Sequence, residues 1–395
     1  MATLTHKDLT TIFLALGILL ASARLLGELA IRFRQPAIIG EILAGILLGP
    51  TVLGTLAPGI SQAVFPMSGS PAIVLKGVAA VSVVLFLLAA GMDVDLSRIF
   101  RQGRAAMAVS VSGIVAPFII GGLAAWAAPE LLGRTEHTPP LIFVLFFATA
   151  MSISALPVIA KTLMDLNLYR SDLGMVVIAA AIFDDLAGWI IFAIVLGMMT
   201  QGGPTFWIGG TIGLTLLFVA FMLTIGRWCI HASLPWIQAK TSWPGGVLAF
   251  ALTLALLSAA FTDWIGIHAV FGSFMAGVAL GDSPHLRERT RATINQFVSS
   301  IFAPLFFASI GLGVNFIEHF DLLLVLLVMA IAMLTKVVGC GLGARAAGMP
   351  WRESWAIGFG MNSRGAMEII LGTLALEFHL IGNRMFVALV VMALS

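Results

Sequence analysis

The stretch that decides the fold, LGMVVIAAAIFDDLAGWIIFAIVLGMM, runs from Leu173 to Met199 and carries Asp184 and Asp185 at its middle. A helix of roughly 20 residues crosses the hydrocarbon core of a bilayer, so this stretch is long enough to span it. An aspartate at that depth costs roughly 3 kcal/mol on insertion scales, and such residues are retained mainly where they serve a function. We therefore expect Asp184 and Asp185 to lie in the functional site.

The composition of the whole chain agrees with a membrane protein. Of its 395 residues, 60% are hydrophobic and only 10% are charged, whereas a soluble domain has about 25% charged residues. The two cysteines, Cys229 and Cys340, have no second Cys or His at ligand spacing, which speaks against a disulfide framework and a metal centre of that kind. The sequence predicts an all-α, polytopic membrane protein in which residues 1–395 form one transmembrane domain without a cofactor.

Apolar segments recur along the chain and predict thirteen membrane spans. Their approximate bounds are 9–31, 36–56, 72–91, 105–127, 140–160, 171–199, 205–226, 244–261, 266–280, 294–313, 321–345, 354–376 and a last one from 385. This last segment falls short of the roughly 20 residues that a crossing needs. Either it continues in a longer protein or the last helix is cut, and a cytoplasmic C-terminal region after Ser395 would not be visible here.

Basic residues predict the orientation of these spans. Fourteen of the 21 fall on alternate loops: Arg32, Arg34, Arg98, Arg101, Arg104, Lys161, Arg170, Arg227, Lys240, Arg287, Arg289, Arg291, Arg345 and Arg352. The positive-inside rule then places the N-terminus outside and the C-terminus in the cytoplasm. A cleaved signal peptide over residues 1–23 is the competing interpretation, but it would leave Arg24, Arg32 and Arg34 outside.

The chain also contains a weak internal repeat. GEILAGILLG at 40–49 resembles GSFMAGVALG at 272–281, and LFLLAAG at 85–91 resembles LFFASIG at 305–311. Both pairs are displaced by seven spans. Because seven is odd, the copies would cross the membrane in opposite directions, which is the inverted-repeat plan of many secondary transporters. We expect the repeats to cover approximately 36–199 and 266–395.

Spans 5 and 12 occupy matching places in the two repeats and have the least helix-like centres. TAMSISALP at 149–157 includes Pro157, which cannot donate a main-chain hydrogen bond. GFGMNSRG at 358–365 includes Asn362, Ser363 and Gly365. Paired interruptions of this kind indicate a midplane binding site, where unwound backbone presents carbonyl oxygens to an ion. The alternative is a proline kink and a glycine packing seam without function.

Taken together, these motifs resemble the monovalent cation:proton antiporter-2 family, which includes bacterial sodium/proton antiporters, potassium efflux systems and plant cation/proton exchangers. The matching stretches are RQP at 34–36 through GP at 49–50, SISALPVIA at 152–160, FDD at 183–185, Lys336, and MNSRGAME at 361–368. The resemblance implies the sodium/proton antiporter fold, in which spans 5 and 12 cross beside the aspartates in a mobile ion-carrying domain. It also implies a homodimer.

The resemblance further assigns roles to individual residues. Asp185 would carry the proton and the monovalent cation, while Asp184 would pair with Lys336. The hydroxyls of Ser152 and Ser154 would complete the oxygen shell of the cation. The SISALP and MNSRG stretches look more like plant exchangers than close sodium-selective relatives, which leaves the choice between Na⁺ and K⁺ open.

Physical chemistry supports a shared site for protons and a cation. Burial disfavours the charged form of a carboxylate and a second carboxylate disfavours it further, so the aspartate pair can hold protons that a cation displaces. Neighbouring residues on a helix point about 100° apart, so Asp184 and Asp185 should have different roles. Lys336 would be a third titrating partner or a structural charge. Arg364 and Glu368 lie four residues apart and are expected mainly to neutralise each other.

Three other functions compete with antiport. An intramembrane aspartyl protease needs catalytic aspartates from two helices, and a channel interpretation lacks a filter sequence and leaves Lys336 unexplained. A sodium-coupled symporter of an organic solute remains the main alternative. No nucleic-acid-binding patch or enzyme motif is present in the sequence. We therefore expect a membrane-embedded, lipid-contacting exchanger of Na⁺ or K⁺ for H⁺ and not an enzyme.

Overall fold

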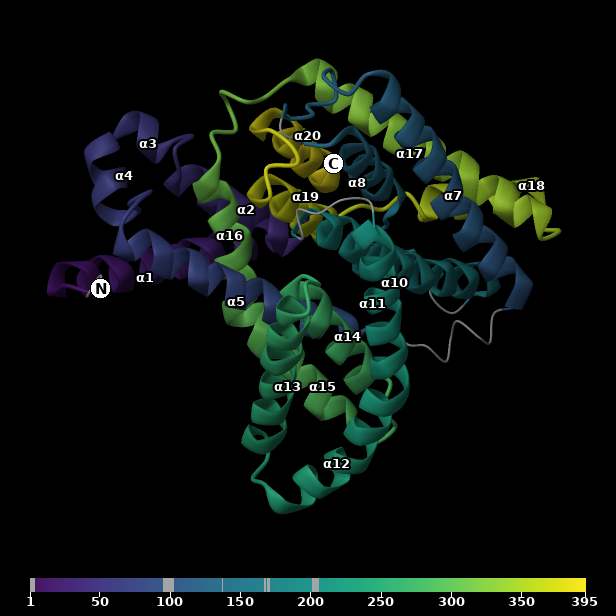
Figure 1. The fold of residues 1–395 in the computed structure, drawn as a ribbon, viewed down its shortest axis with the longest axis horizontal. Coiled ribbons are helices and arrows are strands. Elements are labelled where there is room, and N and C mark those ends of the chain that lie inside the picture. The colour runs from purple at the N-terminus through teal and green to yellow at the C-terminus, as the bar shows by residue number, and fades with distance from the viewer. Residues whose placement is uncertain (1–3, 95–102, 137, 167, 169–170, 201–205) are drawn as a thin grey trace. The chain divides into compact units, whose positions relative to one another are not determined.

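The computed structural model describes residues 4–94, 103–136, 138–166, 168, 171–200 and 206–395, and these are folded into helices and short connections (Figure 1). The helices are α1 (His6–Arg32), α2 (Ala37–Leu48), α3 (Leu53–Leu56), α4 (Pro58–Val64), α5 (Ser70–Met92), α7 (Gly103–Ala127), α8 (Pro140–Ser152), α9 (Leu156–Asp165), α10 (Asp172–Thr200), α11 (Phe206–Phe221), η1 (Met222–Gly226), α12 (Arg227–Lys240), α13 (Gly245–Trp264), α14 (Ala269–Gly281), α15 (Glu288–Phe297), η2 (Val298–Phe302), α16 (Ala303–Gly313), α17 (Leu322–Ala346), α18 (Trp351–Gly360), α19 (Ala366–Glu377) and α20 (Asn383–Leu394).

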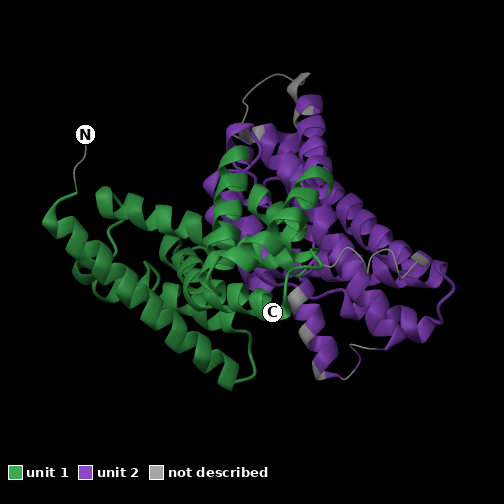
Figure 2. Ribbon diagram, turned by 90° about the horizontal axis from the view of Figure 1, so that it is seen from below, with its two compact units in different colours: residues 1–93, 224–261, 272–320 green, residues 94–223, 262–271, 321–395 purple. Residues whose placement is uncertain are grey.

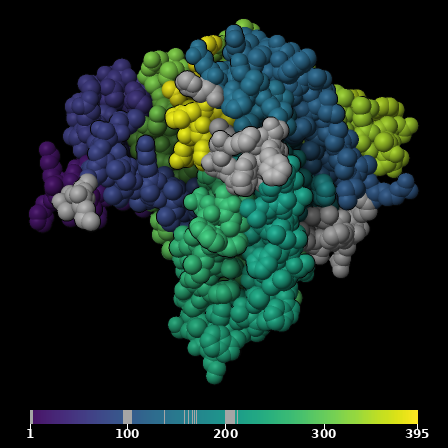
Figure 3. All heavy atoms as spheres, in the orientation of Figure 1, coloured from purple at the N-terminus to yellow at the C-terminus, as the bar shows by residue number. Residues whose placement is uncertain are grey.

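The prediction of an all-α polytopic membrane protein is confirmed. Within the described ranges, nine helical segments are long and apolar enough to cross a membrane, and three shorter apolar helices accompany them. Large apolar side chains point outward from several of these helices, among them Phe13, Leu25, Leu123, Leu257 and Leu334. Figure 3 shows one face of this surface. Extensive exposed apolar area is unusual in soluble monomers and suits contact with lipid.

Each of the thirteen predicted spans coincides with one helix or with consecutive helices, but two predicted boundaries differ from the structure. The helical run of the tenth span begins at Glu288 rather than at 294. The seventh span does not end at 226, because α11, η1 and α12 form an uninterrupted helical run from Phe206 to Lys240. Arg227 suggested a loop, yet its guanidinium lies 2.6 Å from the Asp282 carboxylate and its side chain stays partly exposed. A long basic side chain that reaches a partner or water in this way does not have to end a helix.

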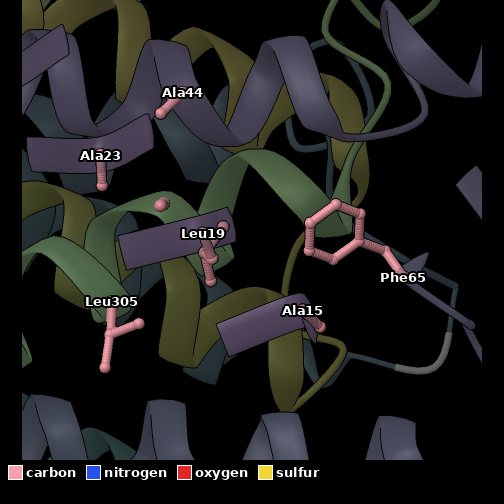
Figure 4. Packing of buried hydrophobic residues seen from close by; sticks show 7 residues of the cluster. Ala15, Leu19, Ala23, Ala44, Phe65 and Leu305 are labelled. Carbon is pink, nitrogen blue, oxygen red and sulfur yellow. The ribbon is translucent and has the colours of Figure 1, made fainter. Parts of the chain in front are cut away.

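The described chain divides into two compact units (Figure 2). Unit 1 consists of residues 1–93, 224–261 and 272–320, and unit 2 of residues 94–223, 262–271 and 321–395. Part of the core of unit 1 is shown in Figure 4, where small and apolar side chains of α1, α2 and α16 belong to one buried cluster with Phe65. The short side chains Ala15, Ala23 and Ala44 allow close packing of helix backbones there.

Two glycine seams in unit 1 relate the repeated sequences to each other. A Cβ atom built on Gly45 of α2 would lie 1.9 Å from the Ala308 carbonyl oxygen of α16. At the equivalent place, a Cβ built on Gly277 of α14 would lie 2.2 Å from the Leu88 carbonyl oxygen of α5. The first element of each predicted repeat thus packs on the second element of the other. This reciprocity supports the inverted repeat, which stays a prediction.

In unit 2, α7 and α17 are packed through small residues. A Cβ on Gly339 would lie 2.8 Å from the Ser112 carbonyl oxygen, and one on Gly343 would lie 2.5 Å from that of Ala108. The glycine run at 339–343 therefore brings two helix backbones together, as close helix packing requires. This contact places Lys336, one turn earlier on α17, against the middle of α7.

Candidate functional site

The predicted interruptions of spans 5 and 12 are confirmed, and the two breaks lie against each other. The helix α8 ends at Ser152 and α9 begins at Leu156, while α18 ends at Gly360 and α19 begins at Ala366. The Ala155 amide donates to the Ser363 carbonyl oxygen at 2.8 Å, and the Ser154 hydroxyl donates to that of Met361 at 2.9 Å. Residues of the α8–α9 break thus donate hydrogen bonds to main-chain carbonyls of the α18–α19 break.

Arg364 occupies the carbonyl end of α8. Pro157 has no N–H to offer Ile153, so the Ile153 carbonyl is without a helical partner, and Arg364 Nη1 donates to it at 2.8 Å. The same guanidinium donates to the carbonyls of Ala150 at 3.1 Å and Met151 at 2.9 Å. A positive charge is favourable at this negative end of a helix. The carbonyl end of α8 is thus hydrogen-bonded to a protein side chain.

Lys336 is completely buried and has three acceptors. Its Nζ lies 2.5 Å from the Ser152 carbonyl oxygen, 3.0 Å from that of Gly113, and 2.5 Å from Asp184 Oδ2. The Gly113 carbonyl is free because Pro117, four residues later in α7, has no N–H to bond it. Sequence reasoning missed Gly113 and Pro117, although a proline inside an apolar span signals a carbonyl that needs another donor.

Asp184 is also fully buried, and both of its oxygens are hydrogen-bonded. Oδ1 accepts from the Ser110 hydroxyl at 2.8 Å and Oδ2 accepts from Lys336, while Ser154 Oγ, whose proton goes to the Met361 carbonyl, lies 3.4 Å from Oδ2. Gly188, one turn later on α10, contacts the α8–α9 break, because a Cβ on it would lie 2.6 Å from Ile153 Cγ1. Asp184 therefore belongs to the face of α10 that packs on this break.

Asp185 differs from its neighbour in one respect that matters chemically. It is 2% exposed, and within the described chain its Oδ1 has no hydrogen-bond partner. One turn later, Trp189 Nε1 donates to Met367 Sδ at 3.2 Å, so this face of α10 meets the start of α19. The charged groups that act on Asp185 are Asp184, Glu368 and Lys336. A buried carboxylate oxygen without a protein donor is suited to a proton or a cation.

The remaining predicted residues lie around the same breaks. The Ser152 hydroxyl donates to the Ala148 carbonyl oxygen at 2.7 Å, and its lone pairs stay available. Glu368 caps α19 by accepting from the Gly365 amide at 2.9 Å, and its other oxygen lies 3.6 Å from Arg364 Nη1. The roles predicted for these residues stay predictions.

Three further positions were predicted to unwind the helices. Ser363 donates to the Gly360 carbonyl oxygen at 3.3 Å, and Asn362 Oδ1 is buried without a hydrogen-bond partner among the described residues. The backbone of Pro157 lies in the first turn of α9, whereas its side chain lies outside the part of the structure that is described.

Comparison with known proteins gives one consistent result. The sequence model of a family described as sodium/hydrogen exchanger, transmembrane, matches residues 16–395. The Na(+)/H(+) antiporter NhaS4 of Synechocystis sp. is 31% identical over 393 residues, which cover 98% of this chain and 95% of that protein. The K(+)/H(+) antiporter 1 of Saccharomyces cerevisiae is 31% identical over 375 residues, covering 91% of this chain and 42% of the yeast protein.

A solved structure shows the same fold. The sodium proton antiporter MjNhaP1 from Methanocaldococcus jannaschii superposes with a TM-score of 0.67 over 98% of this chain and 96% of that one, at 14% sequence identity. The chain spans nearly the full length of NhaS4 but less than half of the yeast relative.

Proposed function

The chain belongs to the sodium/hydrogen exchanger family, which is a transport family, and we propose that it exchanges a monovalent cation, Na⁺ or K⁺, for protons across the cell membrane. Relatives of similar identity are named as Na(+)/H(+) and as K(+)/H(+) antiporters, and therefore support exchange more than they support either cation. In this mechanism the site opens alternately to the two sides of the membrane, and the proton and the cation compete for one carboxylate.

The burial of Asp185 without a hydrogen-bond donor to its Oδ1 is the observation that supports this proposal best. Its carboxylate is buried at the crossing of two interrupted helices, and its Oδ1 has no donor in the described chain. An ionised carboxylate in such surroundings is unfavourable unless a positive charge compensates it. Either a bound proton or a bound cation satisfies this need, but not both at the same oxygen. Mutual exclusion at one site is sufficient for exchange if the carrier crosses readily only when occupied.

Asp184 and Lys336 are the proposed coupled partners of this carrier. Their ion pair lies directly beside Asp185 and is buried on both sides. A cation that binds at Asp185 raises the local positive charge and weakens the hold of Asp184 on the lysine. In this scheme Ser152 and Ser154 supply hydroxyl oxygens, while Arg364 and Glu368 hold the two breaks together.

We also propose how the chain is oriented in the membrane and that it assembles as a dimer. The N-terminus lies outside and the C-terminus in the cytoplasm, and a homodimer forms within the lipid bilayer. The excess of basic residues on the alternate connections that would face the cytoplasm supports this orientation. All predicted site residues lie in unit 2, which supports its role as the mobile ion-carrying domain.

The test is exchange by purified protein in liposomes that hold an imposed pH gradient. A dye reports internal pH while Na⁺, K⁺, Li⁺ or choline is added. We expect Na⁺ or K⁺, but not choline, to dissipate the gradient, and Asp185→Asn to abolish the response. Asp263→Asn, which changes an exposed aspartate, serves as the matched control and should retain exchange. Wild-type exchange in Asp185→Asn, or no response of the wild-type protein to any cation, refutes the proposal.

A further inference from the structure

Several oxygens around the two helix breaks are already hydrogen-bonded to protein side chains, which limits the oxygens that could bind a cation. Arg364 binds the Ala150, Met151 and Ile153 carbonyls, and Lys336 binds that of Ser152. Both Asp184 oxygens also accept hydrogen bonds. The oxygens that geometry alone would offer to an ion at the end of α8 are therefore already bonded to side chains of the protein.

Two side-chain oxygens near the breaks are different. Asp185 Oδ1 and Asn362 Oδ1 are both buried, and neither has a hydrogen-bond partner in the part of the chain that the structure describes. Glu368 Oε1 is also without a hydrogen bond, but it faces the Arg364 guanidinium at 3.6 Å. Buried polar atoms are nearly always satisfied in proteins, and an orphaned one calls for a reason.

The backbone on both sides of Asn362 is fixed against the α8–α9 break. The preceding carbonyl, that of Met361, accepts from the Ser154 hydroxyl, whose oxygen lies 3.4 Å from Asp184 Oδ2. The following carbonyl, that of Ser363, accepts from the Ala155 amide. On the other side of the break, the contact of Trp189 with Met367 holds the Asp185 face of α10 against α19. Asn362 thus lies between two attachments to the α8–α9 break, and Ile153 of that break packs against Gly188 of α10, the helix that carries both aspartates.

We propose that Asn362 is a direct ligand of the transported cation and shares it with Asp185. The proposal rests on the exchange function proposed above and adds to it a residue that determines cation affinity. Hard monovalent cations bind oxygen atoms, including neutral carbonyl oxygens. A side-chain amide does not take up a proton in the physiological range, because it has no titratable group.

This difference separates the two transported ions. The cation contacts both oxygens, whereas the proton binds only the Asp185 carboxylate. Removing the amide therefore weakens cation binding and leaves proton binding intact. A group that only supported the backbone would not produce this separation, since loosening the break would disturb both ions or the maximal rate.

The experiment measures exchange in proteoliposomes as a function of Na⁺ and of K⁺ concentration at two pH values. In Asn362→Ala we expect the KM for the transported cation to rise about tenfold, the equivalent of losing about 1.4 kcal/mol of binding. The maximal rate should stay within about twofold, as for a ligand that binds ground and transition states alike. The ratio of the KM values at the two pH values should equal that of the wild-type protein.

Two further variants make the result specific. Asn383→Ala removes an exposed asparagine amide at the start of α20, away from the breaks, and should leave the KM unchanged. Asn362→Asp has nearly the same size as the wild-type residue but adds a group that binds protons, so the KM should depend more steeply on pH. An unchanged KM in Asn362→Ala, or an unchanged pH dependence in Asn362→Asp, overturns the proposal.

For variants that show no exchange, cation binding is measured instead. The shift of the thermal unfolding midpoint in detergent is followed as Na⁺, K⁺ or choline is added, because a ligand that binds only the folded state raises this midpoint. A folded Asn362→Ala protein that retains the wild-type response overturns the inference, and one that needs a higher cation concentration supports it. If Asn362→Ala does not fold, the pH dependence of the KM in Asn362→Asp tests the inference. Absence of exchange in the wild-type protein contradicts the proposed function itself, a separate outcome.

Discussion

Replacing Lys336 by methionine should destabilise the protein in a way that a second substitution corrects. Lys336→Met keeps most of the side-chain volume but removes the charge that pairs with Asp184 at 2.5 Å. Both side chains are fully buried, so the carboxylate is left without a counter-charge and without access to water. The two hydroxyls that remain nearby, those of Ser110 and Ser154, are neutral.

The contacts of Lys336 set the size of the effect. Removing one partner of a buried ion pair costs about 3–5 kcal/mol. The substitution also deprives the Gly113 and Ser152 carbonyls of their donor, at about 1–3 kcal/mol for each group that stays unsatisfied. We therefore expect Lys336→Met to lower the free energy of unfolding by at least about 3 kcal/mol. Adding Asp184→Asn removes the uncompensated charge and should recover about 2 kcal/mol of this loss.

The assay is a double-mutant cycle on the free energy of unfolding, measured by SDS titration in mixed micelles. Lys76→Met, which changes an exposed lysine of α5, is the matched control and should stay within about 0.5 kcal/mol of the wild-type protein. The double variant should be more stable than Lys336→Met alone. Losses that simply add in the double variant would show that the two charges do not interact, and would refute the reasoning.

Two predictions concern other parts of the chain. Gly45→Ala should lower the unfolding free energy by about 1–3 kcal/mol, because its Cβ would meet the Ala308 carbonyl, whereas Gly17→Ala has open space and should be neutral; equal SDS-titration midpoints would contradict this. The hydrogen bond from Arg384 lowers the pKa of Asp321, so its stabilisation is present above about pH 3.9 and is lost as pH falls through the lowered pKa. Arg384→Ala should therefore lower the thermal midpoint slightly at pH 7 and not in strong acid; the same difference at both pH values would count against this assignment.

The positions of the helix breaks could be predicted because their causes are local. Pro157 removes a donor from its own helix, and the residues from Gly360 to Gly365 favour turns over helix. The apolar segments likewise predicted the places of helices, and nine helical segments of the described chain are long and apolar enough to cross a membrane. The end of the seventh span could not be predicted in this way, because Arg227 stays in a helix by virtue of a partner, Asp282, that is distant in the sequence.

The ion pairs and hydrogen bonds within the site could be predicted only in part. The family resemblance paired Asp184 with Lys336, and the structure contains that contact. It gave no reason to expect Arg364 on the carbonyls of α8, since the guanidinium has to cross from one break to the other to reach them. Which aspartate keeps an oxygen without a donor also depends on three helices at once, and a single span carries no such information.

The reciprocal glycine seams of unit 1 have a consequence for how the protein is made. The seams join α2 to α16 and α5 to α14, so each partner in the first half of the chain needs one from the second half. Synthesis proceeds from the N-terminus, and early segments wait for late ones. While the ribosome is still translating residues before 269, the glycine faces of α2 and α5 lack their native partners α16 and α14. The native packing of unit 1 can therefore be completed only after α16 has been synthesised.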